Sequence, residues 1–131
     1  MALIAAQKGS SGGGESNGFY SDYTKTTSGM TVTTGRMTVD SGGYFIKNGV
    51  CYVDMSITCT LSTPSTKKSF ATMPHTTSSS QINLINSKVG GNLSTYIQDY
   101  DGVTSFEMIR SVDGEKYNII GSYPTDQADT V

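Results

Sequence analysis

The sequence contains one histidine, His75, and its neighbours do not supply the partners that histidine chemistry needs. A catalytic triad requires a nucleophile and a carboxylate around the ring, and a zinc site requires several nitrogen or sulfur ligands. The chain has no Cys-x-x-Cys or His-x-x-x-His pattern, and His75 follows Met73-Pro74 at the start of a Thr/Ser-rich stretch. We therefore interpret His75 as a loop histidine, and we predict no metal centre and no cofactor.

Two pairs of acidic residues lie beside glycines, where either catalysis or turn formation would explain them. Asp99 and Asp101 precede Gly102, whereas Asp113 and Glu115 flank Gly114. A glycosidase needs two carboxylates about 5–9.5 Å apart, and Asp-x-Asp-Gly also opens a calcium-binding EF-hand loop, whose later ligands and flanking helices are missing here. Asp is common in turns because it hydrogen-bonds its own backbone and tolerates positive φ. We interpret all four as turn residues and predict that the protein is not an enzyme.

Tyrosines supply the strongest candidate for a binding surface. Residues 93–100 alternate, so that one face carries Leu93 and Ile97 and the other carries Tyr96, Gln98 and Tyr100. If the apolar positions face a core, the other three side chains stand on the outer face of a sheet, where rings stack on sugars and amides bind hydroxyl groups. Two alternatives remain open, which are packing of Tyr96 against a neighbouring strand and a role for the tyrosines in a subunit interface.

The elements that would position these residues are predicted to be β-strands. Residues 50–61 alternate strictly between apolar and polar side chains, and Asn48-Gly49 joins them to the apolar run 44–47, as in a tight hairpin. Asp101-Gly102 and Asp113-Gly114 separate further alternating runs, while 67–73 and 81–85 supply two more strands. We predict an all-β fold, an antiparallel β-sandwich or jelly roll of about seven or eight sequentially paired strands.

Composition and charge exclude two classes of partner. The chain has 131 residues, a formal net charge of −2 and no basic run, so it is poorly equipped to neutralise the phosphates of a nucleic acid. No stretch approaches the ~20 apolar residues that span a bilayer, so we expect no membrane insertion.

The two cysteines, Cys51 and Cys59, lie on the same predicted strand. Eight residues of extended chain at about 3.3 Å each place them roughly 26 Å apart, whereas a disulfide needs Cα atoms within about 7 Å. We predict that both are reduced and buried, which suits a protein folded inside a cell.

The sequence predicts two regions. Residues 1–18 form an N-terminal arm with a flexible Gly/Ser linker, and residues 19–131 form the β-sandwich domain, with its core at about 43–123. Within the domain, residues 19–40 are expected to form short edge strands or an extended segment. The apolar run Ala2–Ala6 has no domain of its own to bury it, so we expect it to dock on another chain or another protein.

The order of these elements resembles a known family. Gly49-Val-Cys-Tyr-Val53 leads a long alternating strand, and Met73-Pro74 ends a later one. In this respect residues 43–123 resemble the C-terminal β-sandwich head domains of bacteriophage tail fibres and baseplate receptor-binding proteins. The resemblance implies a homotrimeric virion protein whose head binds a saccharide on the host cell surface.

The expected function is therefore attachment, by a virion protein assembled in the host cytoplasm, with the N-terminal arm contacting other virion proteins. Two alternatives agree equally well with the low charge of the sequence and with its many Ser and Thr residues. One is a structural virion part, such as a capsid-decorating or fibre-forming protein without a receptor of its own. The other is a carbohydrate-binding or adhesin module located on a bacterial cell surface.

Overall fold

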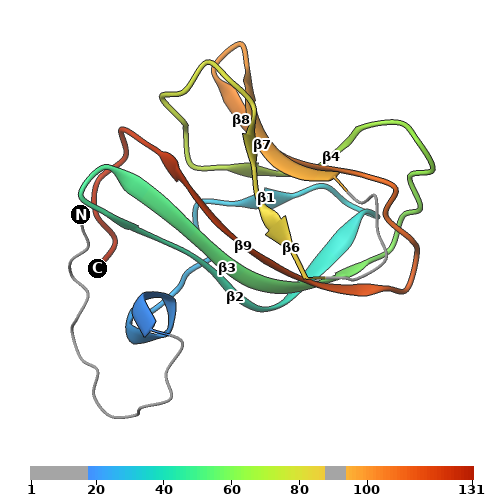
Figure 1. The fold of residues 1–131 in the computed structure, drawn as a ribbon, viewed down its shortest axis with the longest axis horizontal. Coiled ribbons are helices and arrows are strands. Elements are labelled where there is room, and N and C mark those ends of the chain that lie inside the picture. Colours follow the sequence, from blue (N-terminus) through green and yellow to red (C-terminus); the bar gives the residue numbers. More distant parts are fainter. Residues whose placement is uncertain (1–17, 88–93) are drawn as a thin grey trace.

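Two antiparallel sheets packed face to face form the body of the protein (Figure 1). A computed structural model describes residues 18–87 and 94–131, so the predicted arm lies outside the described residues except for Gly18. The predicted all-β sandwich is confirmed by this arrangement.

The two sheets have different sizes. The four-stranded sheet has the order β2, β3, β9, β6, with bounds Met37–Lys47, Val50–Cys59, Lys116–Pro124 and Ile85–Asn86. The five-stranded sheet has the order β1, β4, β8, β7, β5, with bounds Thr31–Val32, Lys68–Met73, Val103–Ile109, Ser94–Tyr100 and Ile82–Asn83.

The strand predicted at 81–85 is divided between the two sheets. Ile82 and Asn83 pair with β7, whereas Ile85 and Asn86 pair with β9. Leu84 lies between the two short strands and is buried in the core. The chain therefore crosses from one sheet to the other at this residue, which a single alternating pattern does not reveal.

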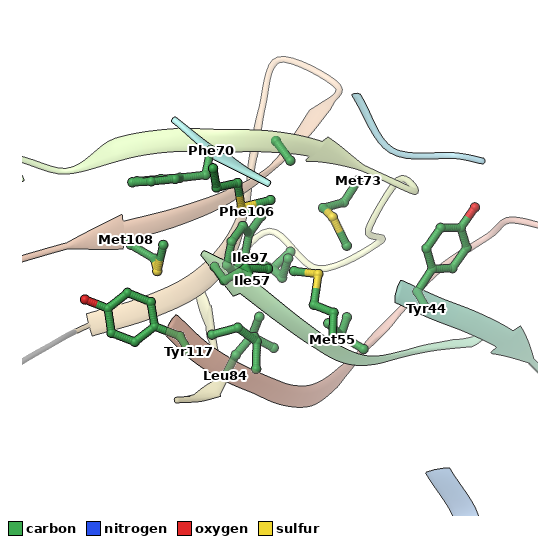
Figure 2. Close-up of a cluster of buried hydrophobic side chains, with 14 of the residues drawn as sticks. Tyr44, Met55, Ile57, Phe70, Met73, Leu84, Ile97, Phe106, Met108 and Tyr117 are labelled. Carbon is green, nitrogen blue, oxygen red and sulfur yellow. The ribbon is translucent and has the colours of Figure 1, made fainter. Parts of the chain in front are cut away.

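The core lies between the sheets and is built from alternate residues of each strand (Figure 2). On β3 every odd position from Cys51 to Cys59 is buried, as the alternation predicts. Both cysteines are buried and unpaired, in agreement with the sequence prediction. Phe70, Ile97 and Phe106 supply the facing layer from the five-stranded sheet. Fully burying one such side chain contributes about 1.5–3 kcal/mol to folding.

Two of the three predicted Gly-turn hairpins are present. Asn48 and Gly49 have φ of 53° and 80°, and Asp101 and Gly102 have φ of 52° and 87°. Positive φ at both central residues twists the turn in the sense that antiparallel strands require. These turns join β2 to β3 and β7 to β8.

The third predicted hairpin, around Asp113-Gly114, is wrong. Strand β8 pairs with β4 and β7, while β9 pairs with β3 and β6, so the turn connects two sheets. The Ser111 hydroxyl donates to the Leu61 carbonyl (2.8 Å), and the Gly114 amide donates to the Cys59 carbonyl (2.9 Å). These two bonds attach residues 111–114 to the segment at the end of β3, so the chain after β8 does not fold back on β8. Glycine at positive φ permits a tight turn but does not determine which strands pair across it.

Strand β2 begins earlier than the sequence predicts, at Met37 rather than near Tyr44. Its pairing with β3 shifts by one residue between Val39 and Ser41, and Gly42 then adopts a φ of 77°. A bulge of this kind interrupts the alternation without ending the strand. The Gly-Gly pair therefore belongs to a continuous strand.

The outer edge of β2 is hydrogen-bonded by segments from both ends of the described chain. Thr26 and Tyr44 exchange two backbone hydrogen bonds of 2.8 and 3.0 Å. The amide of Thr130 donates to the Ile46 carbonyl (2.9 Å), and the Ile46 amide donates to the Thr130 hydroxyl (2.8 Å). Gly43 permits the approach of Thr26, because a Cβ at this position would overlap the Thr26 carbonyl.

The segment that precedes β1 covers the part of the outer face of the four-stranded sheet that β2 and β3 form. This segment starts with a 3-10 helix, Gly18–Asp22, drawn in blue in Figure 1. The ring of Phe45 stacks on Tyr52 with centroids 4.9 Å apart, Tyr20 packs edge-on against Tyr52 at 5.8 Å, and Tyr23 lies 5.0 Å from Phe45. We call these four rings the aromatic cover.

Candidate functional site

The predicted binding residues lie together on the outer face of the five-stranded sheet. Ile97 is fully buried in the core, so its neighbours on β7 point the other way. The register of β7 against β8 sets three cross-strand pairs on this face, which are Tyr96 with Glu107, Gln98 with Ser105 and Tyr100 with Val103. Lys67, which immediately precedes β4, joins the group through its side chain. We call Lys67, Tyr96, Gln98, Tyr100 and Glu107 the Tyr100 cluster.

The two tyrosines of the cluster differ in exposure. Tyr100 is 41% exposed, but Tyr96 is only 3% exposed. Tyr96 lies on the outer face but is buried there by neighbouring side chains, which agrees with the alternative in which it packs against a neighbouring strand. The ammonium group of Lys67 lies over the Tyr96 ring, 5.4 Å from its centroid, which is a cation–π distance. Tyr96 therefore packs beneath Lys67, and of the two tyrosine rings only that of Tyr100 is accessible to solvent.

The hydroxyl of Tyr100 is the centre of the hydrogen-bond network. It accepts a hydrogen bond from Lys67 Nζ at 2.9 Å, and the same ammonium lies 5.6 Å from the Tyr100 ring centroid. Its own proton faces two acceptors, Glu107 Oε1 at 2.9 Å and Gln98 Oε1 at 3.0 Å. Three partners thus fix the orientation of one half-exposed ring.

Glu107 brings a carboxylate into a buried position in this network. The residue is 4% exposed, and its Oε1 lies 4.0 Å from Lys67 Nζ. Burial raises the pKa of Glu107, and the hydrogen bond from Tyr100 and the charge of Lys67 oppose that rise. The hydrogen bond with Tyr100 in turn raises the pKa of Lys67. Since an unpaired buried charge is costly, the cluster holds together as a unit.

Sequence reasoning missed Lys67 and Glu107 as members of the site. The position of Glu107 could have been inferred from the sequence. A charged residue in the alternating run 103–109 is expected to face outward, beside its cross-strand partner on 93–100. No sequence pattern indicates Lys67, because its contact with the tyrosines depends on the path of the chain before β4. The arrangement offers an aromatic face, an amide and a pair of opposite charges, which are groups that can bind a polar ligand.

His75 lies in the loop after β4, as predicted, but between two carboxylates that the sequence did not associate with it. Its Nδ1 is 3.1 Å from Asp126 Oδ2, and its Nε2 is 3.8 Å from Asp99 Oδ1. The predicted turn role of Asp99 is confirmed, because its carboxylate accepts a hydrogen bond from the Gly102 amide at 3.1 Å. These contacts attach the segment after β9 to the sheet.

The described part of the chain has neither a metal-binding cluster nor a membrane-spanning helix. Across residues 18–87 and 94–131, no group of three or more His, Cys, Asp or Glu side chains is arranged to hold a metal ion. Over the same residues, no helix has the length and apolar character needed to cross a membrane.

Comparison with known proteins places the chain in no family. The sequence matches no protein-family model, and neither a curated protein nor a solved structure shows significant similarity to it.

Proposed function

We propose that this protein is a non-enzymatic attachment module that binds a saccharide through the Tyr100 cluster. The single observation behind the proposal is the half-exposed ring of Tyr100, whose hydroxyl is held by Lys67, Gln98 and Glu107. A ring that is already fixed loses little conformational freedom when a ligand stacks on it, so binding costs less entropy.

The neighbours of Tyr100 provide the two other features of a sugar site. Val103, directly opposite on β8, is exposed and extends the apolar wall. Gln98 and Lys67 supply an amide and an ammonium that can bind ring hydroxyl groups. Because Lys67 and Glu107 form a close pair of opposite charges, the cluster favours a neutral sugar over a strongly acidic one.

The biological setting that we propose is a bacteriophage tail fibre or receptor-binding head, located in the virion. Its support is the resemblance carried by Gly49–Val53 and Met73-Pro74, together with a hydroxyl-rich sandwich of low charge. We further propose a homotrimer, since several linked heads turn weak single-site affinity into firm attachment.

A second candidate function is a structural one, in which the Tyr100–Val103 pair belongs to a protein interface. The observation that favours it is the side-by-side exposure of two large apolar side chains at the tip of the β7–β8 hairpin. Exposed tyrosines are enriched in such interfaces. A capsid-decorating protein or a fibre-forming protein would use the pair in this way.

A glycan array probed with the full chain, followed by titration of the variants, tests the first proposal. We expect Tyr100→Ala to weaken binding at least tenfold, or about 1.4 kcal/mol. Val112→Ala, at an exposed site on the connection after β8, serves as the matched control and should bind normally. Unchanged affinity in Tyr100→Ala would exclude the cluster as the sugar site.

Light scattering coupled to size exclusion distinguishes the two candidates. If Tyr100→Ala dissociates an oligomer that Val112→Ala leaves intact, and the parent binds no glycan, the interface role is supported. If the parent is a monomer at tens of micromolar, the trimer proposal fails while the glycan titration still decides the binding role.

A further inference from the structure

The turn between β2 and β3 exposes an asparagine that is followed directly by a glycine, Asn48 and Gly49. The space around Gly49 is open, since a Cβ at this position would meet, apart from its chain neighbours, only the Thr125 carbonyl oxygen at 3.8 Å. Among the described residues, the Gly49 N–H donates to no other backbone group. The nitrogen of Gly49 is therefore accessible both to solvent and to the side chain that precedes it.

An asparagine in this setting can react with the backbone of the next residue. The Gly49 nitrogen loses its proton and forms a bond to the side-chain carbonyl carbon of Asn48. The C–N bond of the side-chain amide then breaks, and the leaving nitrogen takes up a proton and departs as ammonia. Water opens the resulting succinimide ring and gives either aspartate or isoaspartate. Glycine favours the ring closure, because it has no Cβ to obstruct the approach and its backbone is the least restricted.

The segment after β9, drawn in dark red in Figure 1, is attached to this same turn. The Asn48 amide donates a hydrogen bond to Asp129 Oδ1 at 2.8 Å. Two residues earlier, the Ile46 amide donates to the Thr130 hydroxyl at 2.8 Å. A carboxylate therefore lies directly against the residue that would react, so a change of charge at that residue would be felt by the attached segment.

We propose that Asn48 is a site of spontaneous deamidation, and that its conversion releases the segment after β9 from the β2–β3 hairpin. The product carries a carboxylate on the residue whose amide binds Asp129. Two negative charges then lie close together and repel each other, where an uncharged amide stood before. Isoaspartate also lengthens the backbone by one carbon atom, which disturbs a two-residue turn. Both changes oppose the hydrogen bonds that hold Asp129 and Thr130 in place.

Asn83 supplies an internal comparison within the same chain. It is exposed like Asn48, but the residue that follows it, Leu84, is buried in the core. The Leu84 amide also donates a hydrogen bond to the Thr95 carbonyl at 2.9 Å, so its nitrogen is not free to attack. We therefore expect the reaction at Asn48 and not at Asn83. The inference does not depend on the proposed function, because it involves no residue of the Tyr100 cluster.

Peptide mass spectrometry of the full chain, after incubation at mildly alkaline pH, tests the reaction. Trypsin places Asn48 in peptide 48–67 and Asn83 in peptide 69–88, and fragment spectra give the fraction of each that has become an acid. We expect conversion at Asn48 to exceed that at Asn83 by about tenfold, because Gly49 offers an unobstructed nitrogen. Equal conversion at the two sites would overturn the proposal. So would an unchanged Asn48 under conditions that convert it in the urea-unfolded chain.

A matched pair of variants tests the release. Asn48→Asp introduces the charge of the product, Asn48→Gly removes the amide without adding charge, and both keep a residue pair that suits this turn. Hydrogen exchange of the Ile46 amide, which donates to Thr130, should be about fivefold faster in Asn48→Asp than in Asn48→Gly, as expected for one pair of like charges at a surface. The Met55 amide, at the centre of β3, should exchange equally in both. Equal exchange at Ile46, or an acceleration that includes Met55, would overturn the release.

Discussion

The two outer faces of the sandwich carry the same kind of residue and use it differently. On the four-stranded sheet, Tyr20, Tyr23 and Tyr52 pack against Phe45, which has no exposed surface. On the five-stranded sheet, Tyr100 is joined to charged and amide groups and remains half-exposed.

The difference shows that the residue next to a tyrosine, more than the tyrosine itself, decides its role. A ring beside Phe45 gains by burying its apolar area. A ring beside Glu107 and Lys67 is held by its hydroxyl, so that its face is left accessible. Four experiments can break or sharpen this comparison.

The largest effect is expected for Phe45→Ala. Removing a fully buried ring that stacks on Tyr52 should lower the free energy of unfolding by about 3–5 kcal/mol. Urea denaturation followed by circular dichroism measures the loss. Val103→Ala, at an exposed site on the other sheet, is the control and should change stability by less than about 0.5 kcal/mol. A loss below 1 kcal/mol for Phe45→Ala would mean that the aromatic cover does not stabilise the sheet.

The buried thiols report whether the loss of the cover opens the sheet. Burial raises the pKa of both Cys51 and Cys59 to about 11, so neither should react with a thiol reagent at pH 8 in the native protein. A stability loss of about 3 kcal/mol populates open forms about 100-fold more often, and labelling in Phe45→Ala should accelerate to match. Two rapidly reacting thiols in the native parent would contradict the structure.

A smaller effect is expected for Tyr100→Ala. The variant leaves the Glu107 carboxylate without its hydroxyl donor but removes little buried area, so we expect a loss of about 1–2 kcal/mol. By the same relation, thiol labelling should accelerate by no more than about 30-fold, which corresponds to about 2 kcal/mol. If Tyr100→Ala destabilises the protein as much as Phe45→Ala, the two faces do not differ in the way described here.

The smallest effect concerns pH and Glu107. Because burial raises the pKa of Glu107 in the folded state, this state holds the proton more tightly than the unfolded chain does. The group therefore adds stability that is present below its unfolded pKa and is lost as the pH rises through its folded pKa. Denaturation from pH 4 to 7 should show this loss in the parent and not in Glu107→Gln. If the stability of the two proteins changes with pH in the same way, the titration of Glu107 does not contribute to the pH dependence.

Local features of the fold were predictable because they depend on neighbouring residues alone. Positive φ at Asn48-Gly49 and Asp101-Gly102 follows from residue type, and the burial of alternate residues on β3 follows from its period of two. The pairing across Asp113-Gly114 was not predictable, because it depends on bonds from Ser111 to the distant residue Leu61. Such contacts leave no trace in the turn itself.

The candidate site was predictable to the same extent. The alternation on β7 correctly grouped Tyr96, Gln98 and Tyr100 on one face. It could not reveal that Tyr96 is buried, because the covering side chain, Lys67, comes from a segment before β4. Sequence patterns therefore identified the face, and the structure determined which ring on it is accessible.

The hydrogen bonds along the edge of β2 have a consequence for how copies of this chain behave at high concentration. A long, open edge strand is a template on which sheets of separate molecules join into fibres. Here the edge at Tyr44 and Ile46 is already occupied by Thr26 and Thr130, while the opposite edge of the sheet ends in the two-residue strand β6. Trimming the last residues, from Asp129 onward, would free the Ile46 and Asn48 amides and leave this edge of β2 open to pairing with another molecule.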